Sequence, residues 1–268
     1  MKQAEADNAR GTEIKTAGHT KAPKLASKSQ SKASTSRTAK AGKNPSEKTP
    51  ADSRPRRKHM RAAEREQAII EEAVRFFAEH GFEGQTRELA KRMGITHSAI
   101  YRHIPSKEVL IERVYEHVYL SRWNPDWAAL VTDRSQSLES RLTQFYLEYV
   151  ERVFDYDWVR IFAFSGLKSF DITSRYLAII GDRIIRPACA ELRRELDLPA
   201  PEEIPVNERE AELLWGLHGR IFYLAIRRYV YVTPTPEDLT PVVRDAVRIF
   251  RSGVEPVLRD MLGESAPR

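Results

Sequence analysis

Hydrophobic residues begin to recur with the period of an α-helix at about residue 62. Ile69, Ala73 and Phe76 lie at i, i+4 and i+7, and their neighbours Ile70, Val74 and Phe77 widen the same apolar face. The pair His80-Gly81 then interrupts the pattern, and glycine commonly follows the last residue of a helix. The pattern predicts an amphipathic helix over about 62–80.

Three shorter helical patterns follow this first helix. Thr86 is the expected N-cap of one that Gly94 stops, with Leu89, Ala90 and Met93 facing inward. The next runs from about 96 to 104. Ser106 is positioned to cap a further helix that ends before Asn124-Pro125. Its expected inner stripe is Val109, Leu110, Val114 and Val118.

The remaining pattern is also helical. The first apolar stripe consists of Leu138, Leu142, Phe145, Tyr149 and Val153. Residues 158–167 are apolar enough to form a buried helix, and 172–196 form a long helix with an expected kink at Pro187. Two further amphipathic helices have the stripes Leu213, Leu214, Leu217, Ile221, Leu224 and Ala225, and Val242, Ala246, Ile249 and Phe250. Gly253 and Pro256 are expected to break the last of these. No strand pattern, internal repeat or glycine-rich phosphate loop is found, so the fold class is predicted to be all-α.

The charge is divided unevenly along the chain. Residues 1–61 carry sixteen Lys and Arg against five Asp and Glu, a net of +11, whereas the remainder carries 28 basic and 33 acidic residues, a net of −5. Residues 1–58 contain no aromatic residue and cannot bury enough apolar area to form a core. They are predicted to be a disordered basic tail, either a solvated appendage or a polycation that attracts DNA phosphates.

The sequence argues against several classes of protein. The single cysteine, Cys189, precludes an intramolecular disulfide and lies in an apolar pattern typical of inert core. No apolar run approaches the roughly 20 residues that span a bilayer, and no signal region follows the polar N-terminus. The seven histidines are scattered, and no nucleophile motif is present. We therefore expect no catalytic site, no metal, no cofactor and a cytoplasmic, nucleoid-associated location.

The short helix at 96–104 has the properties of a DNA-reading element. At 1.5 Å per residue it is about 14 Å long, a length that fits within a single major groove of DNA. Ile100 and Ile104 share one face and can anchor it, which leaves Thr96, His97 and Ser98 at the N-terminal end where base edges are usually met. Five basic residues and one acidic residue lie between 87 and 107, a local charge of +4.

The spacing of these residues resembles the DNA-binding domain of the TetR family of bacterial regulators. The shared positions are Gly81-Phe82, Leu89-Ala90, Gly94, Ile95, Tyr101, His103 and Lys107. The resemblance covers about residues 62–122. Two positions depart from the family pattern: the stretch from Gly81 to Ala90 is one residue shorter than is common, and Ala99 stands where a hydroxyl residue is frequent.

The resemblance assigns roles to named residues. It implies that phosphates are held by Thr86, Arg87, Tyr101, His103 and Lys107. It also implies that His97 and Ser98 contact bases. Thr96 is added to them because it lies at the same N-terminal end of the helix. The alternative is an ordinary three-helix bundle with Tyr101 and His103 merely on its surface.

In the family that this chain resembles, the helical body binds a small effector and dimerises through its last two helices. Here these helices would be about 207–232 and 236–252. An aromatic-rich set predicts an apolar effector pocket with one cationic contact for an acidic or lipid-like ligand. Its members are Trp123, Trp127, Trp158, Arg160, Phe162 and Phe164. The alternative is that these aromatic residues are plain core, and His218 is expected to be a satisfied histidine of the dimer interface.

The sequence therefore predicts three parts: a disordered tail (1–58), a helix-turn-helix DNA-binding domain (59–122) and a helical effector-binding and dimerisation domain (123–268). The predicted function is that of a ligand-responsive transcriptional regulator. It would be a homodimeric repressor that binds double-stranded DNA at a palindromic operator and releases it on binding an unidentified small molecule. The alternative is a nucleoid-associated architectural protein that binds DNA without a small-molecule ligand.

Overall fold

The computed structural model describes residues 61–167 and 171–263, and every regular element in these ranges is helical. The predicted all-α fold class is thus confirmed for this part of the chain, while the predicted tail, 1–58, lies outside it. The helices are α1 (Ala62–His80), α2 (Thr86–Arg92), α3 (His97–His103), α4 (Lys107–Val118), α5 (Trp127–Thr132), α6 (Leu138–Val153), α7 (Tyr156–Leu167), α8 (Ile172–Ile180), α9 (Arg186–Glu195), α10 (Glu208–Tyr229) and α11 (Thr240–Met261).

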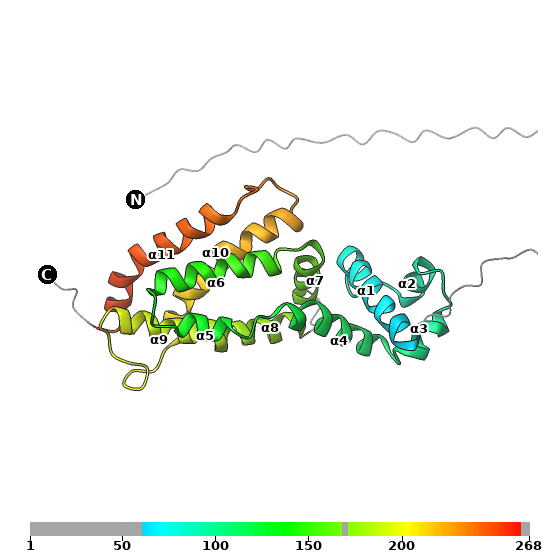
Figure 1. The fold of residues 1–268 in the computed structure, drawn as a ribbon, viewed down its shortest axis with the longest axis horizontal. Helices are drawn as coiled ribbons and strands as arrows, with labels where there is room; N and C mark the ends of the chain where they lie inside the picture. The colour runs from blue at the N-terminus through cyan, green and yellow to red at the C-terminus, as the bar shows by residue number, and fades with distance from the viewer. Residues whose placement is uncertain (1–60, 168–170, 264–268) are drawn as a thin grey trace, which may run out of the picture. The chain divides into compact units, whose positions relative to one another are not determined.

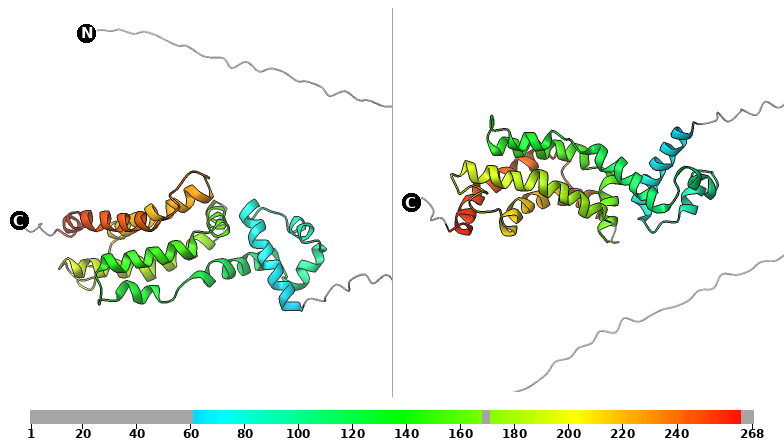
Figure 2. Two further views of the ribbon diagram at one scale, coloured as in Figure 1. Left: turned by 45° about the horizontal axis from the view of Figure 1, so that its top comes forward. Right: turned by 90° about the horizontal axis from the view of Figure 1, so that it is seen from below.

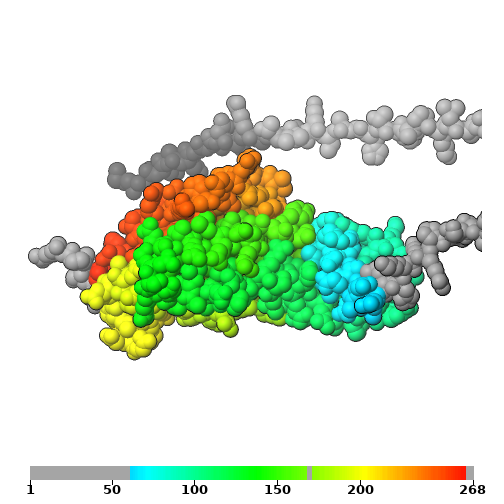
Figure 3. Space-filling model, viewed as in Figure 1, coloured from blue at the N-terminus to red at the C-terminus, as the bar shows by residue number. Residues whose placement is uncertain are grey.

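Helices α1, α2 and α3 form a small head, and α4 leads from it into the body (Figure 1). The apolar stripe of α1 is buried as the periodicity predicts, with Ile69 and Phe77 fully enclosed. One side of α1 packs against α4 and another against α7 of the body. On the face drawn in Figure 3, the surface of α1 meets that of the body directly.

Helix α4 begins as the sequence predicts, and three of its four predicted inner residues, Leu110, Val114 and Val118, are buried. Ser106 is its N-cap, and its hydroxyl oxygen accepts a hydrogen bond from the Val109 amide at 3.3 Å. The predicted inner position Val109 is wrong, because its side chain is 38% exposed. Ile111 and Tyr115 are buried instead, since α4 must pack against both α1 and the body.

The body is built around α6, whose five predicted apolar positions are all buried. The six-residue helix α5, which the periodicity did not reveal, packs against α6 and places Trp127 in the core. The Trp127 indole nitrogen donates a hydrogen bond to the Glu148 carboxylate at 2.9 Å, so its polar atom is satisfied despite burial.

The long helix predicted over 172–196 is interrupted in the middle. Helix α8 ends at Ile180, a π-helical turn η2 (Gly181–Ile185) follows, and α9 continues from Arg186. The turn comes just before Pro187, whose ring would clash with the carbonyl four residues earlier in a regular α-helix and whose nitrogen has no hydrogen to donate. The expected disturbance at Pro187 therefore takes the form of a widened turn.

Helices α10 and α11 lie side by side (Figure 2). The predicted break at Gly253 and Pro256 is wrong, because α11 runs unbroken to Met261. Of the predicted stripe, Ala246 is buried and Val242 and Phe250 are half-buried, but Ile249 is 51% exposed. The buried residues of α11 are Val243, Ala246, Val247, Val254 and Leu258. Burial of Val254 and Leu258 on either side of Pro256 offsets its helix-breaking cost, about 3 kcal/mol in a helix interior.

Buried ion pairs hold α9 in place. Arg193 and Glu210 are both fully buried, and the guanidinium group also donates hydrogen bonds to the carbonyls of Pro199 and Ile204. A second network joins buried Arg141 of α6 to Glu191 of α9, with nitrogen and oxygen 3.0 Å apart. Satisfying each charge with several hydrogen bonds is what makes such burial tolerable.

Candidate nucleic-acid interface

The turn between α2 and α3 closes with two characteristic hydrogen bonds. The Ile95 amide donates to the Ala90 carbonyl at 3.0 Å, and the Gly94 amide donates to the Lys91 carbonyl at 3.1 Å. This pair is the Schellman arrangement, and it requires a positive φ at the residue after the C-cap. Gly94 has φ +64° and meets that need without strain. The predicted role of Gly94 as the stop of α2 is confirmed.

Thr86 joins α2 to α3. It does not cap α2, as the sequence suggested; Gln85 is the N-cap, and Thr86 is the first helical residue. Its hydroxyl oxygen lies 2.8 Å from Nε2 of His97 and 2.9 Å from the Tyr101 hydroxyl. The rings of His97 and Tyr101 meet edge to face, with centroids 4.8 Å apart. One buried hydroxyl group, 8% exposed, thus orients two side chains of α3.

Helix α3 is held to the head by one face and exposes the rest. Its anchors Ile100 and Ile104 are buried as predicted. Thr96 is the N-cap residue, and its hydroxyl oxygen lies 3.1 Å from that of Ser98; both residues are exposed. His97 is half-buried, and only its Nδ1 is left without a protein partner at this site.

The cations around α3 differ in how free they are. Arg92 turns back to α1, where Glu79 and Glu72 both engage its guanidinium, with Nη2 and Oε1 of Glu79 3.0 Å apart. The Arg92 hydrogen bond holds the pKa of the Glu79 carboxyl below its usual range. Arg92 is therefore neutralised locally. The basic residues with no ion pair among the described residues are Arg87, Lys91, Arg102 and Lys107.

The predicted phosphate contacts occupy different environments. Arg87 is exposed on α2, and Lys107 is the first residue of α4. Tyr101 and His103 are half-buried on α3, whereas Thr86 is buried and already shared by two side chains. Sequence reasoning missed the link from Thr86 to His97 and Tyr101, because it connects residues eleven and fifteen positions apart.

The six residues predicted to line an effector pocket divide into two groups. Trp127 and Trp158 are fully buried, and Trp123 and Phe162 pack beside them, with the Trp158 and Phe162 rings stacked at 5.2 Å. Arg160 instead contacts the head: its Nε donates to the Ala78 carbonyl of α1 at 2.6 Å. Its guanidinium carbon lies 5.3 Å from the centre of the Phe164 ring, so these two belong to a separate site.

In the aromatic interior, three buried polar atoms have no hydrogen-bond partner among the described residues. They are the Tyr146 hydroxyl, Nε1 of Trp158 and Nδ1 of His218. His218 faces inward from α10, with its ring 5.2 Å from that of Tyr149 on α6. Burial lowers the pKa of His218 to about 4. The expected satisfied interface histidine is therefore wrong in both respects, because the ring is enclosed within the subunit and one nitrogen is unpaired.

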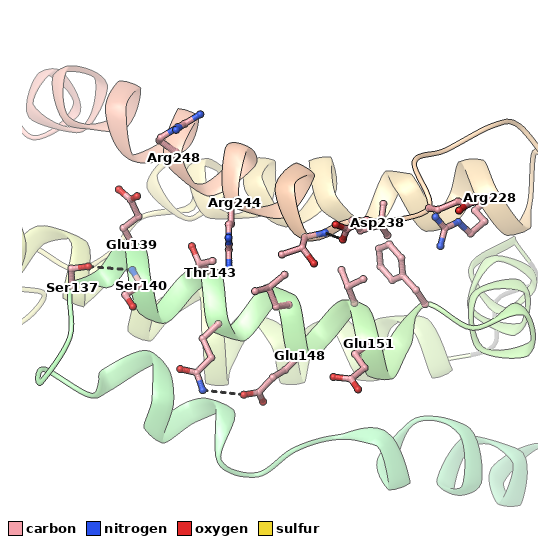
Figure 4. A pocket seen from close by; sticks show the side chains of 17 residues that line it. Ser137, Glu139, Ser140, Thr143, Glu148, Glu151, Arg228, Asp238, Arg244 and Arg248 are labelled. Carbon is pink, nitrogen blue, oxygen red and sulfur yellow. Dashed lines mark hydrogen bonds between the residues drawn. The ribbon is translucent and has the colours of Figure 1, made fainter.

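An open groove of about 1020 Å³ lies between α6 and α11 (Figure 4). Glu139 and Thr143 of α6 face Arg244 of α11 across it. None of the six predicted pocket residues lines it, and its charged walls differ from the mostly apolar lining typical of small-molecule sites.

The described residues contain no cluster of three or more His, Cys, Asp or Glu side chains arranged to hold a metal ion. Among these residues, no helix has the length and apolar character needed to cross a membrane. Cys189 is buried, and this raises the pKa of its thiol to about 12.

Comparison with known proteins places the head in a family. Residues 69–114 match the model of bacterial regulatory proteins of the tetR family. No curated protein matches the chain. Among solved structures, a TetR family transcriptional regulator from Pseudomonas syringae pv. tomato is 17% identical, with 70% of this chain and 94% of that one covered and a TM-score of 0.48.

A second solved structure, the TetR family transcriptional regulator PfmR from Thermus thermophilus, is 22% identical. The alignment covers 70% of this chain and 98% of that one, with a TM-score of 0.48. The sequence match over 69–114 includes α2, α3 and the turn between them, the segment whose exposed face carries the unpaired cations. The match identifies residues 69–114 as a DNA-binding helix-turn-helix domain of the kind found in bacterial regulatory proteins of the tetR family.

Proposed function

We propose that this protein is a homodimeric repressor that occupies a palindromic operator and leaves it when a small effector binds. It would act in the cytoplasm, at the nucleoid. The observation that carries the proposal is the exposed N-terminal end of α3, flanked by Arg87, Lys91, Arg102 and Lys107, which form no ion pair with any residue that the structure describes. Free cations beside a short exposed helix suit phosphates on either side of a major groove.

Base reading is proposed for Thr96, His97 and Ser98. The two hydroxyl groups are exposed, and the His97 ring is fixed through Nε2, which leaves Nδ1 to meet a base edge. Phosphate binding is proposed for Arg87, Tyr101, His103 and Lys107, with Thr86 acting through the side chains that it orients.

Dimerisation is proposed through α10 and α11. The outward face of α10 carries Gly216, Gly219 and exposed Tyr223, and that of α11 carries Gly253 and exposed Ile249. Small residues allow helices to approach closely, and the exposed apolar side chains gain from burial against a second copy. This role also accounts for the apolar position of Ile249 that its own subunit does not bury.

Effector binding is proposed in the aromatic interior, next to Trp123, Trp127, Trp158 and Phe162. The unpartnered polar atoms of Trp158, Tyr146 and His218 support this site, because leaving such atoms buried and unpaired is costly. Arg160 is already bonded to the head, and the lowered pKa keeps His218 neutral. We therefore expect an uncharged effector in place of an acidic one.

Selection of bound DNA from a random pool tests the proposal. A dimeric regulator should yield an inverted repeat and bind it roughly 10³-fold more tightly than random DNA at fixed salt. Preference of only a few-fold would favour the alternative, an architectural DNA-binding protein without an effector. Replacing Thr96, His97 and Ser98 together by alanine should change the selected half-site; an unchanged half-site would refute their base-reading role.

Effector binding is tested on the same operator complex. Uncharged aromatic compounds are screened for release of the operator, and each active compound is repeated with Trp158→Phe. Loss of the indole N–H should weaken release while operator affinity without compound stays unchanged. Equal release from both proteins would place the effector elsewhere.

A further inference from the structure

Two helix ends meet at one guanidinium group. Arg160 of α7 donates from Nε to the Ala78 carbonyl at 2.6 Å and from Nη1 to the Tyr229 carbonyl at 3.4 Å. Ala78 lies in the last turn of α1, and Tyr229 is the last residue of α10. Carbonyls in the last turn of a helix have no partner within that helix and lie at the negative end of its dipole. A cation placed between two such ends stabilises both.

Aromatic rings and a close backbone approach hold this cation in place. The guanidinium carbon lies 5.2 Å from the centre of the Tyr156 ring and 5.3 Å from that of Phe164. The Phe164 ring in turn lies against Gly81, where an added Cβ would be 3.2 Å from Phe164 Cδ1. The Tyr229 hydroxyl donates to the Phe154 carbonyl at 2.8 Å, which fixes the end of α10 to the segment that starts α7.

The elements that converge on Arg160 have separate tasks. Helix α1 supports the DNA-binding head, and α10 is the proposed dimer helix. We propose that Arg160 is a positioning residue that fixes the orientation of each head relative to the dimer and so determines which half-site spacing the protein accepts. This inference rests on the proposed dimeric, operator-binding function.

The chemistry of arginine suits this task and that of lysine does not. A planar guanidinium can donate in two directions while its faces contact aromatic rings. A lysine ammonium keeps the charge but is a single point, so it reaches one carbonyl or the other. Arg160→Lys should therefore retain the fold and lose part of the coupling, and Arg160→Met should lose more of it.

The experiment compares Arg160→Met, Arg160→Lys and a control, Arg259→Met, in the full-length dimer. Arg259 of α11 also donates to a carbonyl near a helix end, that of Leu196 at 2.7 Å, but it has no contact with the head. Binding is measured by fluorescence anisotropy, at fixed salt, on four DNAs. These are the selected operator, operators with one or two base pairs inserted between half-sites, and a duplex with one half-site.

For Arg160→Met we expect at least about tenfold weaker binding to the selected operator, because loss of a single charged hydrogen bond produces about that change and Arg160 makes two. The ratio of selected to altered spacing should shrink several-fold, while single half-site binding stays unchanged. Arg160→Lys should give intermediate ratios, and Arg259→Met should match the wild type.

A wild-type spacing ratio in both Arg160 variants would overturn the inference and leave the proposed function intact. Equal loss on the single half-site would also overturn it, because the defect would then lie within the head. A wild-type protein with no spacing preference would overturn the proposed dimeric function, and this inference with it.

Discussion

Replacing Thr86 by valine should weaken operator binding without disturbing the core of the head. Valine matches threonine in shape and fits the same nearly buried position, but it removes the hydroxyl group that lies 2.8 Å from His97 Nε2 and 2.9 Å from the Tyr101 hydroxyl. Both α3 side chains then lose the contact that orients them before DNA arrives.

The magnitude follows from the number of side chains released. Immobilising a freed side chain on binding costs about 0.5–1.5 kcal/mol. Two such side chains, His97 and Tyr101, give about 1–3 kcal/mol per head. Since about 1.4 kcal/mol is a factor of ten, we expect operator affinity to fall at least tenfold.

Fluorescence anisotropy on the selected operator, at fixed salt, measures this loss. Thr86→Ser is the matched control, because it keeps the hydroxyl group and should retain most of the affinity. The reasoning is refuted if Thr86→Val binds as the wild type does, or if Thr86→Ser loses as much as Thr86→Val.

Three other changes give separable results. Lys107→Ala should weaken binding to all DNA sequences alike and reduce the slope of log affinity against log salt by about one per head; an unaltered slope would exclude a phosphate contact. Burial lowers the pKa of His218 from 6.5 to about 4, so between these pH values the unfolded chain binds a proton that the folded protein does not. The free energy of unfolding should therefore fall by on the order of 3 kcal/mol as the pH drops from 6.5 to 4. Urea titrations of His218→Leu should lack this loss, and an unchanged pH profile would contradict it. Arg193→Met should lower the free energy of unfolding by about 3–5 kcal/mol, because it leaves the buried Glu210 carboxylate without its ion-pair partner. The control Arg248→Met removes a surface ion pair and should lower it by less than about 1 kcal/mol. Similar urea midpoints for the two variants would contradict this prediction.

The sequence was most informative where one face of a helix is buried against its own subunit. All five predicted positions of α6 are buried, because they repeat over four turns and face one core; buried Arg141 and Tyr146 were not predicted. In α11 the same reasoning failed: Ile249 keeps the helical period but lies on the outer face. Periodicity identifies an apolar face and cannot say which molecule covers it. Helix α5 was missed because six residues are too few to show a period.

Within the candidate site, spacing located the helix-turn-helix and left its internal contacts undetermined. The role of Gly94 follows from local backbone geometry, so the sequence predicted it. The position of Arg92 depends on how α2 crosses α1, which a list of local charges does not reveal. Burial of Arg193 likewise runs against the usual exposure of arginine, and only the tertiary fold supplies its partners.

The π-helical turn η2 acts as a one-residue adjustment of helical phase. A π turn holds one residue more than an α turn, and each residue of an α-helix advances about 100° around its axis. The turn therefore lets α8 direct Tyr176 toward the aromatic interior while α9 directs Glu191 toward Arg141. The five residues of η2 turn through about the angle that four residues cover in an α-helix, so deleting Asp182 should restore a regular α-helix and leave the direction of α9 almost unchanged. Because Glu191 and Arg193 would then keep their partners, this turn should tolerate the loss of one residue better than the regular helices on either side of it.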